Sequence, residues 1–203
     1  MKKIIYLCMA SLTLLACFSA CGKSTPDKET TTSDIKVIDF DTTTSEETTA
    51  PIKKNKNYKI TIPEDLISVD YDGDVDSYAS LYGYDIIERS NGEVTLKMDG
   101  TEYSMLLSRV GMKTIRELGA IVDSNDFSYA EELKDFSDDF SYILITVNAK
   151  KYNKADNKDF FLSLVSQCGL YYQCHANSES PLCQVVIADS ESGKVLTNKI
   201  YRN

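Results

Sequence analysis

The chain has 203 residues and carries 31 acidic against 22 basic side chains, so its formal net charge is −9. This length allows one or two domains. An acidic chain without a basic stripe along its sequence is a poor partner for nucleic acid, and the composition therefore excludes that class of function. The negative charge mainly favours solubility.

The first residues have the layout of an export signal. Lys2 and Lys3 give a positive start, and Ile4 to Leu15 form an apolar run of about a dozen residues, which is the usual length of a secretory h-region. Such a run is too short to cross a bilayer, because a spanning helix takes about 20 residues. The alternatives are a simple cleaved secretory peptide and an interior helix, but a buried helix rarely opens with Met-Lys-Lys and ends in a polar tract.

A small residue directly before a cysteine follows the apolar run twice, and this pattern resembles the lipobox of bacterial lipoproteins, whose cysteine is acylated and becomes the mature N-terminus. Cys17 follows an alanine, with a leucine three places earlier. Cys21 also follows an alanine and precedes Gly22-Lys23-Ser24, a common start of mature lipoproteins. Cys21 is therefore favoured as the lipidation site, with Cys17 as the alternative. The resemblance implies a signal peptide over residues 1–20, an acyl anchor such as palmitate, and a place on the extracytoplasmic face of the cell membrane.

Residues 21–56 are predicted to be a disordered, lipid-anchored tether. Between Gly22 and Lys56 the chain consists mainly of Thr, Ser, Asp, Glu and Lys and has little to bury. Apolar residues between Ile35 and Phe40 interrupt this tract briefly, and a β-strand there is the alternative interpretation. Residues 57–203 then form a single domain.

The domain is expected to contain a first strand, a short helix, three hairpins and two long helices. Alternation predicts the first strand at Tyr58–Ile62, and Asp74 is placed to cap a short helix that Gly83 ends. Asn91-Gly92 is the strongest hairpin signal in the chain. The predicted hairpins pair Asp85–Arg89 with Glu93–Met98, Tyr129–Asp135 with Phe140–Val147, and Cys183–Ala188 with Val195–Tyr201. Apolar residues at steps of three and four predict the long helices at Thr101–Val122 and Lys154–Gln173.

Hairpins that alternate with helices, without the spacing of parallel βαβ units, predict an α+β domain. The expected architecture is a two-layer sandwich, in which one antiparallel sheet of successive β-hairpins carries both amphipathic helices on one face. Apolar residues on both sides of Phe140–Val147 predict a central strand that is covered on one face and partly shielded on the other. The two hairpin-then-helix units are similar in layout, so an internal duplication is a hypothesis.

Four stretches carry a resemblance to a known group of proteins: Ile60-Thr61-Ile62-Pro63, Asp76-Ser77-Tyr78-Ala79 with Gly83, Asn91-Gly92-Glu93-Val94-Thr95, and Ser192-Gly193-Lys194-Val195. Together with the signal, they resemble a family of uncharacterised lipoproteins from Gram-positive anaerobes. The likeness covers the signal and most of residues 58–203. It implies a small α+β fold and an envelope location, and it implies no catalytic residues.

The most conspicuous polar cluster consists of Asp70, Asp72, Asp74 and Asp76. Alternating carboxylates begin an EF-hand calcium loop, so these four residues are weak candidates for a metal site. Counted from Asp70, however, position 6 is a valine where the loop needs glycine, and position 12 is a leucine where it needs a bidentate glutamate. The favoured interpretation is a helix cap, and no metal or cofactor is expected.

Three cysteines remain after the proposed signal and Cys21: Cys168, Cys174 and Cys183. With His175 they would supply a Cys3His metal site, but the spacing lacks a Cys-x2-4-Cys knuckle and Cys168 lies on the apolar stripe of a helix. A buried thiol is the favoured interpretation for Cys168. If any disulfide forms, the expected pair is Cys174 and Cys183, at a helix end and at the following strand.

No sequence motif indicates catalysis. His175 is the single histidine, so a Ser-His-Asp or Cys-His arrangement would have to use it, and it is expected in a loop. The predicted function is a non-enzymatic binding or accessory module, with the membrane as one partner through the lipid anchor and an unidentified envelope protein or small ligand as the other. The alternative is an envelope enzyme that uses carboxylate acid/base chemistry. A deep cleft with two convergent acids of raised pKa would favour the enzyme, and a shallow polar surface would favour the binding module.

Overall fold

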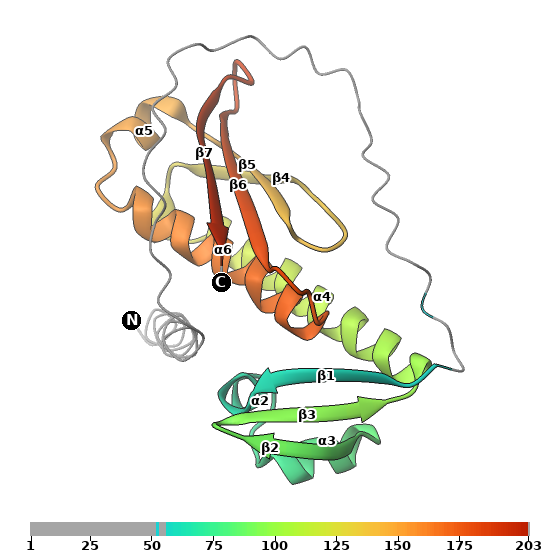
Figure 1. Ribbon diagram of the computed structural model, residues 1–203. Helices are drawn as coiled ribbons and strands as arrows, with labels where there is room; N and C mark the ends of the chain where they lie inside the picture. Colours follow the sequence, from blue (N-terminus) through green and yellow to red (C-terminus); the bar gives the residue numbers. More distant parts are fainter. Residues whose placement is uncertain (1–51, 53–55, 203) are drawn as a thin grey trace.

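The computed structural model describes residue 52 and residues 56–202, and these residues form two β-sheets joined by two long helices (Figure 1). The proposed signal, both candidate lipidation sites and the Ile35–Phe40 segment lie outside the described residues. The smaller sheet, sheet A, has the order β1-β3-β2. The larger, sheet B, has the order β4-β5-β6-β7. The strands are β1 (Tyr58–Pro63), β2 (Asp85–Ser90), β3 (Glu93–Met98), β4 (Ala130–Phe136), β5 (Tyr142–Val147), β6 (Leu182–Asp189) and β7 (Val195–Arg202).

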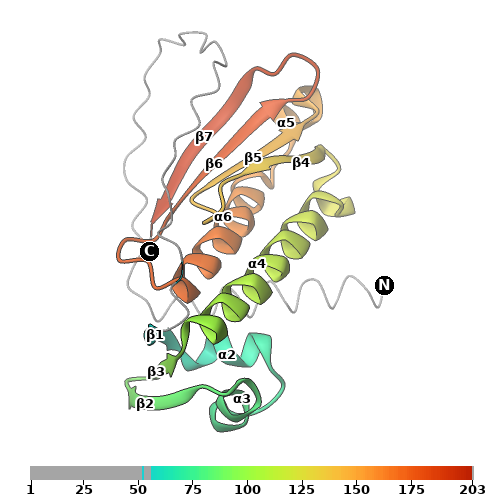
Figure 2. The ribbon, with the colours of Figure 1, turned by 90° about the vertical axis from the view of Figure 1, so that its right-hand side faces the viewer.

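Two long helices run side by side between the sheets, and shorter helices pack at either end (Figure 2). The helices are α2 (Glu64–Asp70), α3 (Val75–Tyr82), α4 (Gly100–Val122), η1 (Asn125–Phe127), α5 (Ala149–Lys154) and α6 (Lys158–His175). Helices α2 and α3 belong to the sheet A end, whereas α5 lies at the opposite end of the molecule, next to sheet B. In the described part of the chain, no helix combines the length and the apolar character that crossing a membrane would require.

The hydrophobic core has two parts, one under each sheet. Helix α4 contributes to both, because Leu106 from its first half lies in the sheet A core and Leu118 from its second half lies in the sheet B core. Both leucines are fully buried. The ring of Tyr172 on α6 packs against both cores. The two sheets are therefore parts of one continuous packed structure that α4 and α6 hold together.

The prediction of an α+β fold is confirmed, and α4 and α6 both pack on one face of sheet B. The prediction of one antiparallel sheet is wrong in two respects. The strands divide into two sheets, because the 23 residues of α4 carry the chain about 34 Å away from sheet A before β4 begins. Strands β5 and β6 pair in parallel, because α5 and α6 return the chain to the end where β5 started.

Local sequence signals set most element boundaries. Asp99 caps α4 by accepting hydrogen bonds from the backbone N–H groups of Thr101 (2.7 Å) and Glu102 (2.9 Å), and the Glu102 carboxylate accepts one from the N–H of Asp99 (2.7 Å), which completes a capping box. Asp74 caps α3, and Gly83 ends it in the left-handed conformation, both as predicted. The three hairpins are also confirmed. The expected helix at Lys154–Gln173 corresponds to α6, which begins four residues later and ends two residues later, and α2 and α5 were not predicted.

Alkaline solution is expected to unfold this core. Burial raises the pKa of Tyr103 to about 12, that of Tyr201 to about 12 and that of the Cys183 thiol to about 12. These groups lose their protons at lower pH in the unfolded chain than in the folded protein. Their contribution to stability is therefore fully present below their ordinary pKa values and is lost as the pH rises towards 12. Urea unfolding between about pH 9 and about pH 12 should show this fall. In Tyr103→Phe the fall should be shallower, and an unfolding free energy that stays constant over this range would contradict the prediction.

Candidate functional site

The described surface has a groove of about 550 Å3 between α3 and β2, at the sheet A end of the molecule. Helix α3 contributes Ala79 and Ser80 to its lining, and β2 contributes Ile86 and Ile87. Tyr84, in the connection between the two elements, also lines it. The groove stays open because the side chains at positions 79 and 80 are small.

The strand that borders the groove is an edge strand. In the order β1-β3-β2, one side of β2 has no neighbouring strand among the described residues. A β-bulge between Ile86 and Glu88 interrupts the pairing of β2 with β3, and the side chain of Ile87 is 44% exposed. Bulges on edge strands limit pairing with further strands and redirect side chains. A ligand in the groove would therefore contact the side chains of the two isoleucines and would not pair as a further strand along the backbone of β2.

Carboxylates on the rim of the groove are paired with basic side chains. Asp76 lies 2.9 Å from the guanidinium of Arg89, and Asp85 lies 3.7 Å from the ammonium group of Lys97. The hydrogen bond with Asp76 raises the pKa of Arg89. The four side chains are between 38% and 72% exposed, so water screens both pairs and they contribute little to stability. The rim is thus polar and charged. Its two ion pairs can open at little cost, so their side chains can contact polar groups of a ligand instead.

A cluster of three tyrosines around Arg109 fixes α3 against α4 behind the groove. The guanidinium of Arg109 stacks on the ring of Tyr82, 3.7 Å from its centroid. Its Nη2 atom donates hydrogen bonds to the hydroxyl oxygens of Tyr78 (2.9 Å) and Tyr84 (3.4 Å). The ring of Tyr78 is buried and contacts the rings of both other tyrosines edge-on. Since Tyr84 also lines the groove, this cluster holds one side of the groove in place.

Arg109 is charged without a carboxylate partner in the described part of the chain. Burial opposes its charge, but the hydroxyl groups of Tyr78 and Tyr84 outweigh that effect and raise its pKa. Burial raises the pKa of Tyr84 in turn, although the hydrogen bond from Arg109 opposes this. This cluster was not predicted from the sequence. The signal available in the sequence was three tyrosines at positions 78, 82 and 84, followed by a predicted helix that contains Arg109 and Arg116.

The aspartates proposed as weak metal candidates have other roles in the structure. Asp74 accepts a 2.7 Å hydrogen bond from the backbone N–H of Ser77, which lowers the pKa of Asp74, and Asp76 pairs with Arg89. Asp72 is exposed, and the side chain of Asp70 lies outside the described part. Within the described residues, no three His, Cys, Asp or Glu side chains are grouped as metal ligands. The helix-cap interpretation of Asp74 is therefore confirmed.

No disulfide joins Cys168, Cys174 and Cys183 in the described part of the chain, so the pair of Cys174 and Cys183, expected if any bridge formed, is absent there. The two residues also belong to different parts of the core: Cys183 is buried under sheet B with Cys168, whereas Cys174 packs against the sheet A core. Burial raises the pKa of Cys168 and Cys183, which makes both poor nucleophiles. His175 is not in a loop but is the last residue of α6, fully buried, with Nδ1 2.9 Å from the carbonyl oxygen of Tyr171.

Every carboxyl group with a resolved pKa shift in the described part is shifted downward. The residues are Asp74, Asp139, Asp159 and Asp189. Side-chain hydrogen bonds from Lys199 and Ser192 lower the pKa of Asp159 and Asp189, respectively. For Asp139, burial acts in the opposite direction, but hydrogen bonds from Ser141 and Ser137 outweigh it. These four groups are ionised at neutral pH and cannot donate a proton there.

The structure thus brings together α3, β2 and Arg109 at one end of the molecule as the candidate binding surface. Cys17 and Cys21, the two candidate lipidation sites, lie outside the described residues. Comparison of the chain with family models, with curated proteins and with solved structures found no match in any of the three.

Proposed function

We propose that the protein is a lipid-anchored lipoprotein of the extracytoplasmic face of the cell membrane, and that its domain is a non-enzymatic binding or accessory module. The anchor is Cys21, and residues 21–56 connect it to the domain. The signal layout and the Ala-Cys pattern support the anchor. The groove between α3 and β2 is the observation that supports binding.

Three properties of the groove suit it to ligand binding. The groove is open to solvent, with a volume of about 550 Å3, so a ligand or a segment of a partner protein can enter it directly. Ile86 and Ile87 provide apolar contact area, while Asp76, Ser80 and Asp85 make the lining mainly polar, which suits a ligand with polar or charged groups. The Arg109 cluster holds α3 in place before a ligand arrives, so little ordering entropy is lost on binding.

The alternative function, an envelope enzyme with carboxylate acid/base chemistry, has less support. A general acid needs a carboxyl group whose pKa is raised towards neutrality. The resolved shifts of carboxyl groups are all downward, and the two carboxylates beside the groove, Asp76 and Asp85, each face a basic side chain. These features favour the binding module.

The anchor is tested by mass spectrometry of the protein from the membrane fraction. We expect a mature chain that begins at a diacylated Cys21 and lacks residues 1–20. An acylated chain that begins at Cys17 would move the lipidation site and keep the anchor. An unmodified chain that is released into the medium would refute the anchor.

The groove is tested by photo-crosslinking in intact cells with a photoreactive amino acid in place of Ile87. We expect a discrete adduct, because this side chain is 44% exposed at the groove. Ile115 on α4 is the matched control, since it is also an isoleucine and is 42% exposed. The same probe at Ile115 should give no such adduct. Equal adducts at both positions, or none at position 87, would contradict the proposed site.

A further inference from the structure

The solvent-facing side of α4 carries apolar side chains and no carboxylate. Seven side chains of this helix are exposed, and they are three apolar residues, three with hydroxyl groups and one arginine: Thr101, Ser104, Met105, Ser108, Met112, Ile115 and Arg116. Met105 and Met112 are each 65% exposed, more than any other large apolar side chain in the described part of the chain. The outer face of a surface helix is normally charged or polar. In a chain with 31 acidic side chains, a face without carboxylates indicates a surface that meets another protein surface and not water alone.

Five of these side chains have the spacing of a coiled-coil seam. They recur at steps of four, three, four and three residues: Thr101, Met105, Ser108, Met112 and Ile115. Residues at these steps form one line along a helix, and in a coiled coil they pack between the side chains of a second helix. The line, which we call the α4 seam, is about 21 Å long at about 1.5 Å per residue. Tyr103 and Val110, on the opposite side of α4, are buried in the sheet A core, so the α4 seam faces away from the domain.

We propose that the α4 seam packs against the α4 seam of a second copy of the protein, with the two helices antiparallel around a two-fold axis at the level of Val110. A two-fold dimer uses the same surface on both copies, so this surface must fit itself. Antiparallel pairing places Ser108 of each copy against Met112 of the other, and Met105 of each copy against Ile115 of the other. The inner pairs each combine a small side chain with a long one, and the flexible methionine fills the space beside the serine.

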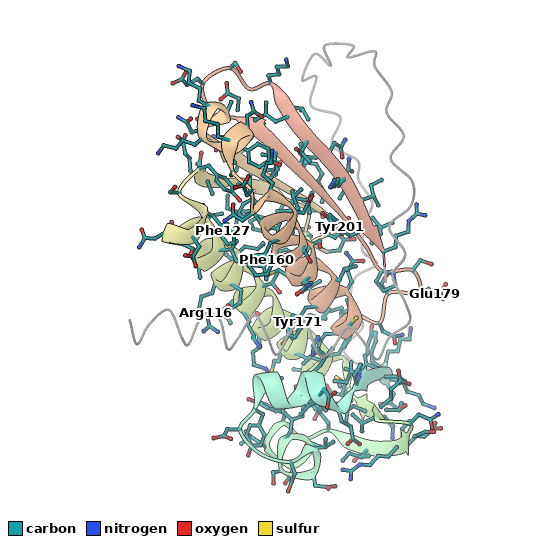
Figure 3. All side chains as sticks on the ribbon, turned by 90° about the vertical axis from the view of Figure 1, so that its left-hand side faces the viewer. Arg116, Phe127, Phe160, Tyr171, Glu179 and Tyr201 are labelled. Atoms are coloured by element: carbon teal, nitrogen blue, oxygen red, sulfur yellow. The ribbon has the colours of Figure 1, made fainter. Side chains whose placement is uncertain are left out.

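The charges beside the α4 seam are complementary in this arrangement. Because the seam has no carboxylate, two acidic chains can approach each other there without like-charge repulsion. Antiparallel pairing also places Arg116 of each copy beside Glu102 of the other. Glu102 uses one carboxylate oxygen in the capping box of α4, and the second oxygen can accept a hydrogen bond from the guanidinium. The Arg116 side chain is 74% exposed, lies 3.6 Å from Glu117, and is on the outer side of α4 in Figure 3.

A parallel pair of α4 helices has no such complementarity. It would place Ser104 and Gly111 beside Arg109 and Arg116 of the second copy, so no ion pair would form. In the antiparallel pair, the two Arg109 residues come near the two-fold axis. Each guanidinium is held against its own α3, 3.7 Å from the ring centroid of Tyr82, and therefore points away from the other copy. The charges thus favour the antiparallel dimer.

The size of the α4 seam predicts a weak dimer. A stable protein interface buries roughly 800 Å2 on each partner, and one line of five side chains is smaller than that. We therefore expect a dissociation constant on the order of 100 μM. This inference does not depend on the lipid anchor or on the groove between α3 and β2, because the α4 seam uses neither.

The dimer is tested by sedimentation velocity of the chain from Gly22 to Asn203, at concentrations from about 5 to about 500 μM. We expect a monomer at the lowest concentration and mainly dimer at the highest. Met112→Lys should weaken the dimer at least about tenfold, because the two ammonium groups would lie close together on either side of the two-fold axis. Ile200→Lys is the matched control. It places the same charge at an apolar side chain of β7 that is 56% exposed and lies outside the α4 seam, so it should leave the dimer unchanged. Circular dichroism checks the fold of both variants.

The antiparallel direction is tested by photo-crosslinking of the purified chain at the highest of these concentrations, with a photoreactive amino acid in place of Met105. We expect an adduct of twice the mass of the chain, in which position 105 is joined to the tryptic peptide that contains Ile115 of the other copy. Trypsin cleaves after Arg109 and Lys113, so this peptide is separate from the one that contains position 105. A parallel dimer would instead join position 105 of one copy to the position 105 peptide of the other.

Three results would overturn the inference: a monomer at every concentration, equal weakening by Met112→Lys and Ile200→Lys, or a link between the two position 105 peptides. An adduct of a probe at Ile115 with a different protein in intact cells would also overturn it, because the α4 seam would then belong to that partner. A homodimer adduct has twice the mass of the chain, so the Ile115 control of the groove experiment is scored at the mass of the Ile87 adduct. A groove adduct without a dimer refutes the dimer only, and a dimer without a groove adduct refutes the groove only.

Discussion

Replacing Phe161 with alanine is expected to lower the free energy of unfolding by about 3–5 kcal/mol. The side chain is fully buried on α6, in the core under sheet B. Its ring centroid lies 5.0 Å from that of Phe127 and 5.4 Å from that of Tyr129, so truncation removes aromatic contacts and leaves a cavity among rigid neighbours. Urea denaturation of the two proteins measures the difference. A loss of this size is a large fraction of the free energy of unfolding of a typical domain, so the variant would be only marginally stable at 37 °C.

The adjacent Phe160 provides a matched control in the same helix. It is 48% exposed, and its ring centroid lies 6.1 Å from that of Phe127. Figure 3 labels both residues, which are neighbours on that side of the molecule. Phe160→Ala removes the same number of atoms but should cost only about 1 kcal/mol or less, because much of this side chain is already in water. If both variants lost a similar free energy of unfolding, the assignment of Phe161 to the buried face of α6 and of Phe160 to its exposed face would be incorrect.

Replacing Gly169 with alanine is expected to destabilise the protein by about 2 kcal/mol, although alanine is the better helix former. A β-carbon at this position of α6 would lie 2.6 Å from the carbonyl oxygen of Phe140 and 2.8 Å from the sulfur of Cys183. The carbonyl is backbone and cannot rotate away. Phe140 itself has a φ of 57°, so its backbone is already held in an uncommon conformation. The helix must therefore move away from sheet B, and thermal unfolding should show the lower midpoint.

Gly119 in α4 is the control for this substitution. An added β-carbon there meets no other atom within 4 Å. Gly119→Ala should therefore stabilise the protein by about 0.5–1 kcal/mol through helix propensity alone. The two substitutions are chemically identical, and opposite signs of their effects would demonstrate that close packing of α6 on sheet B decides the outcome at position 169. A stabilised Gly169→Ala variant would contradict that packing.

Local chemistry allowed several elements to be predicted from the sequence alone. Asp74 and Gly83 bound α3, and Asn91-Gly92 turns the first hairpin with positive φ values of 55° and 79°. These signals act through hydrogen bonds and backbone conformations within four or five residues, so no information about the rest of the fold is needed. The apolar periodicity likewise predicted α4, and the alternation of hairpins with helices predicted the α+β class.

Which strands pair outside the three hairpins, and which distant side chains meet, was decided only by the tertiary structure. The parallel pairing of β5 with β6 depends on the path that α6 takes across the sheet, and no local pattern encodes that path. Arg109 and Tyr78 are 31 residues apart, and their contact requires α3 to pack on α4. A contact between side chains depends on their distance in space, and for residues far apart in the sequence that distance is set only by the fold.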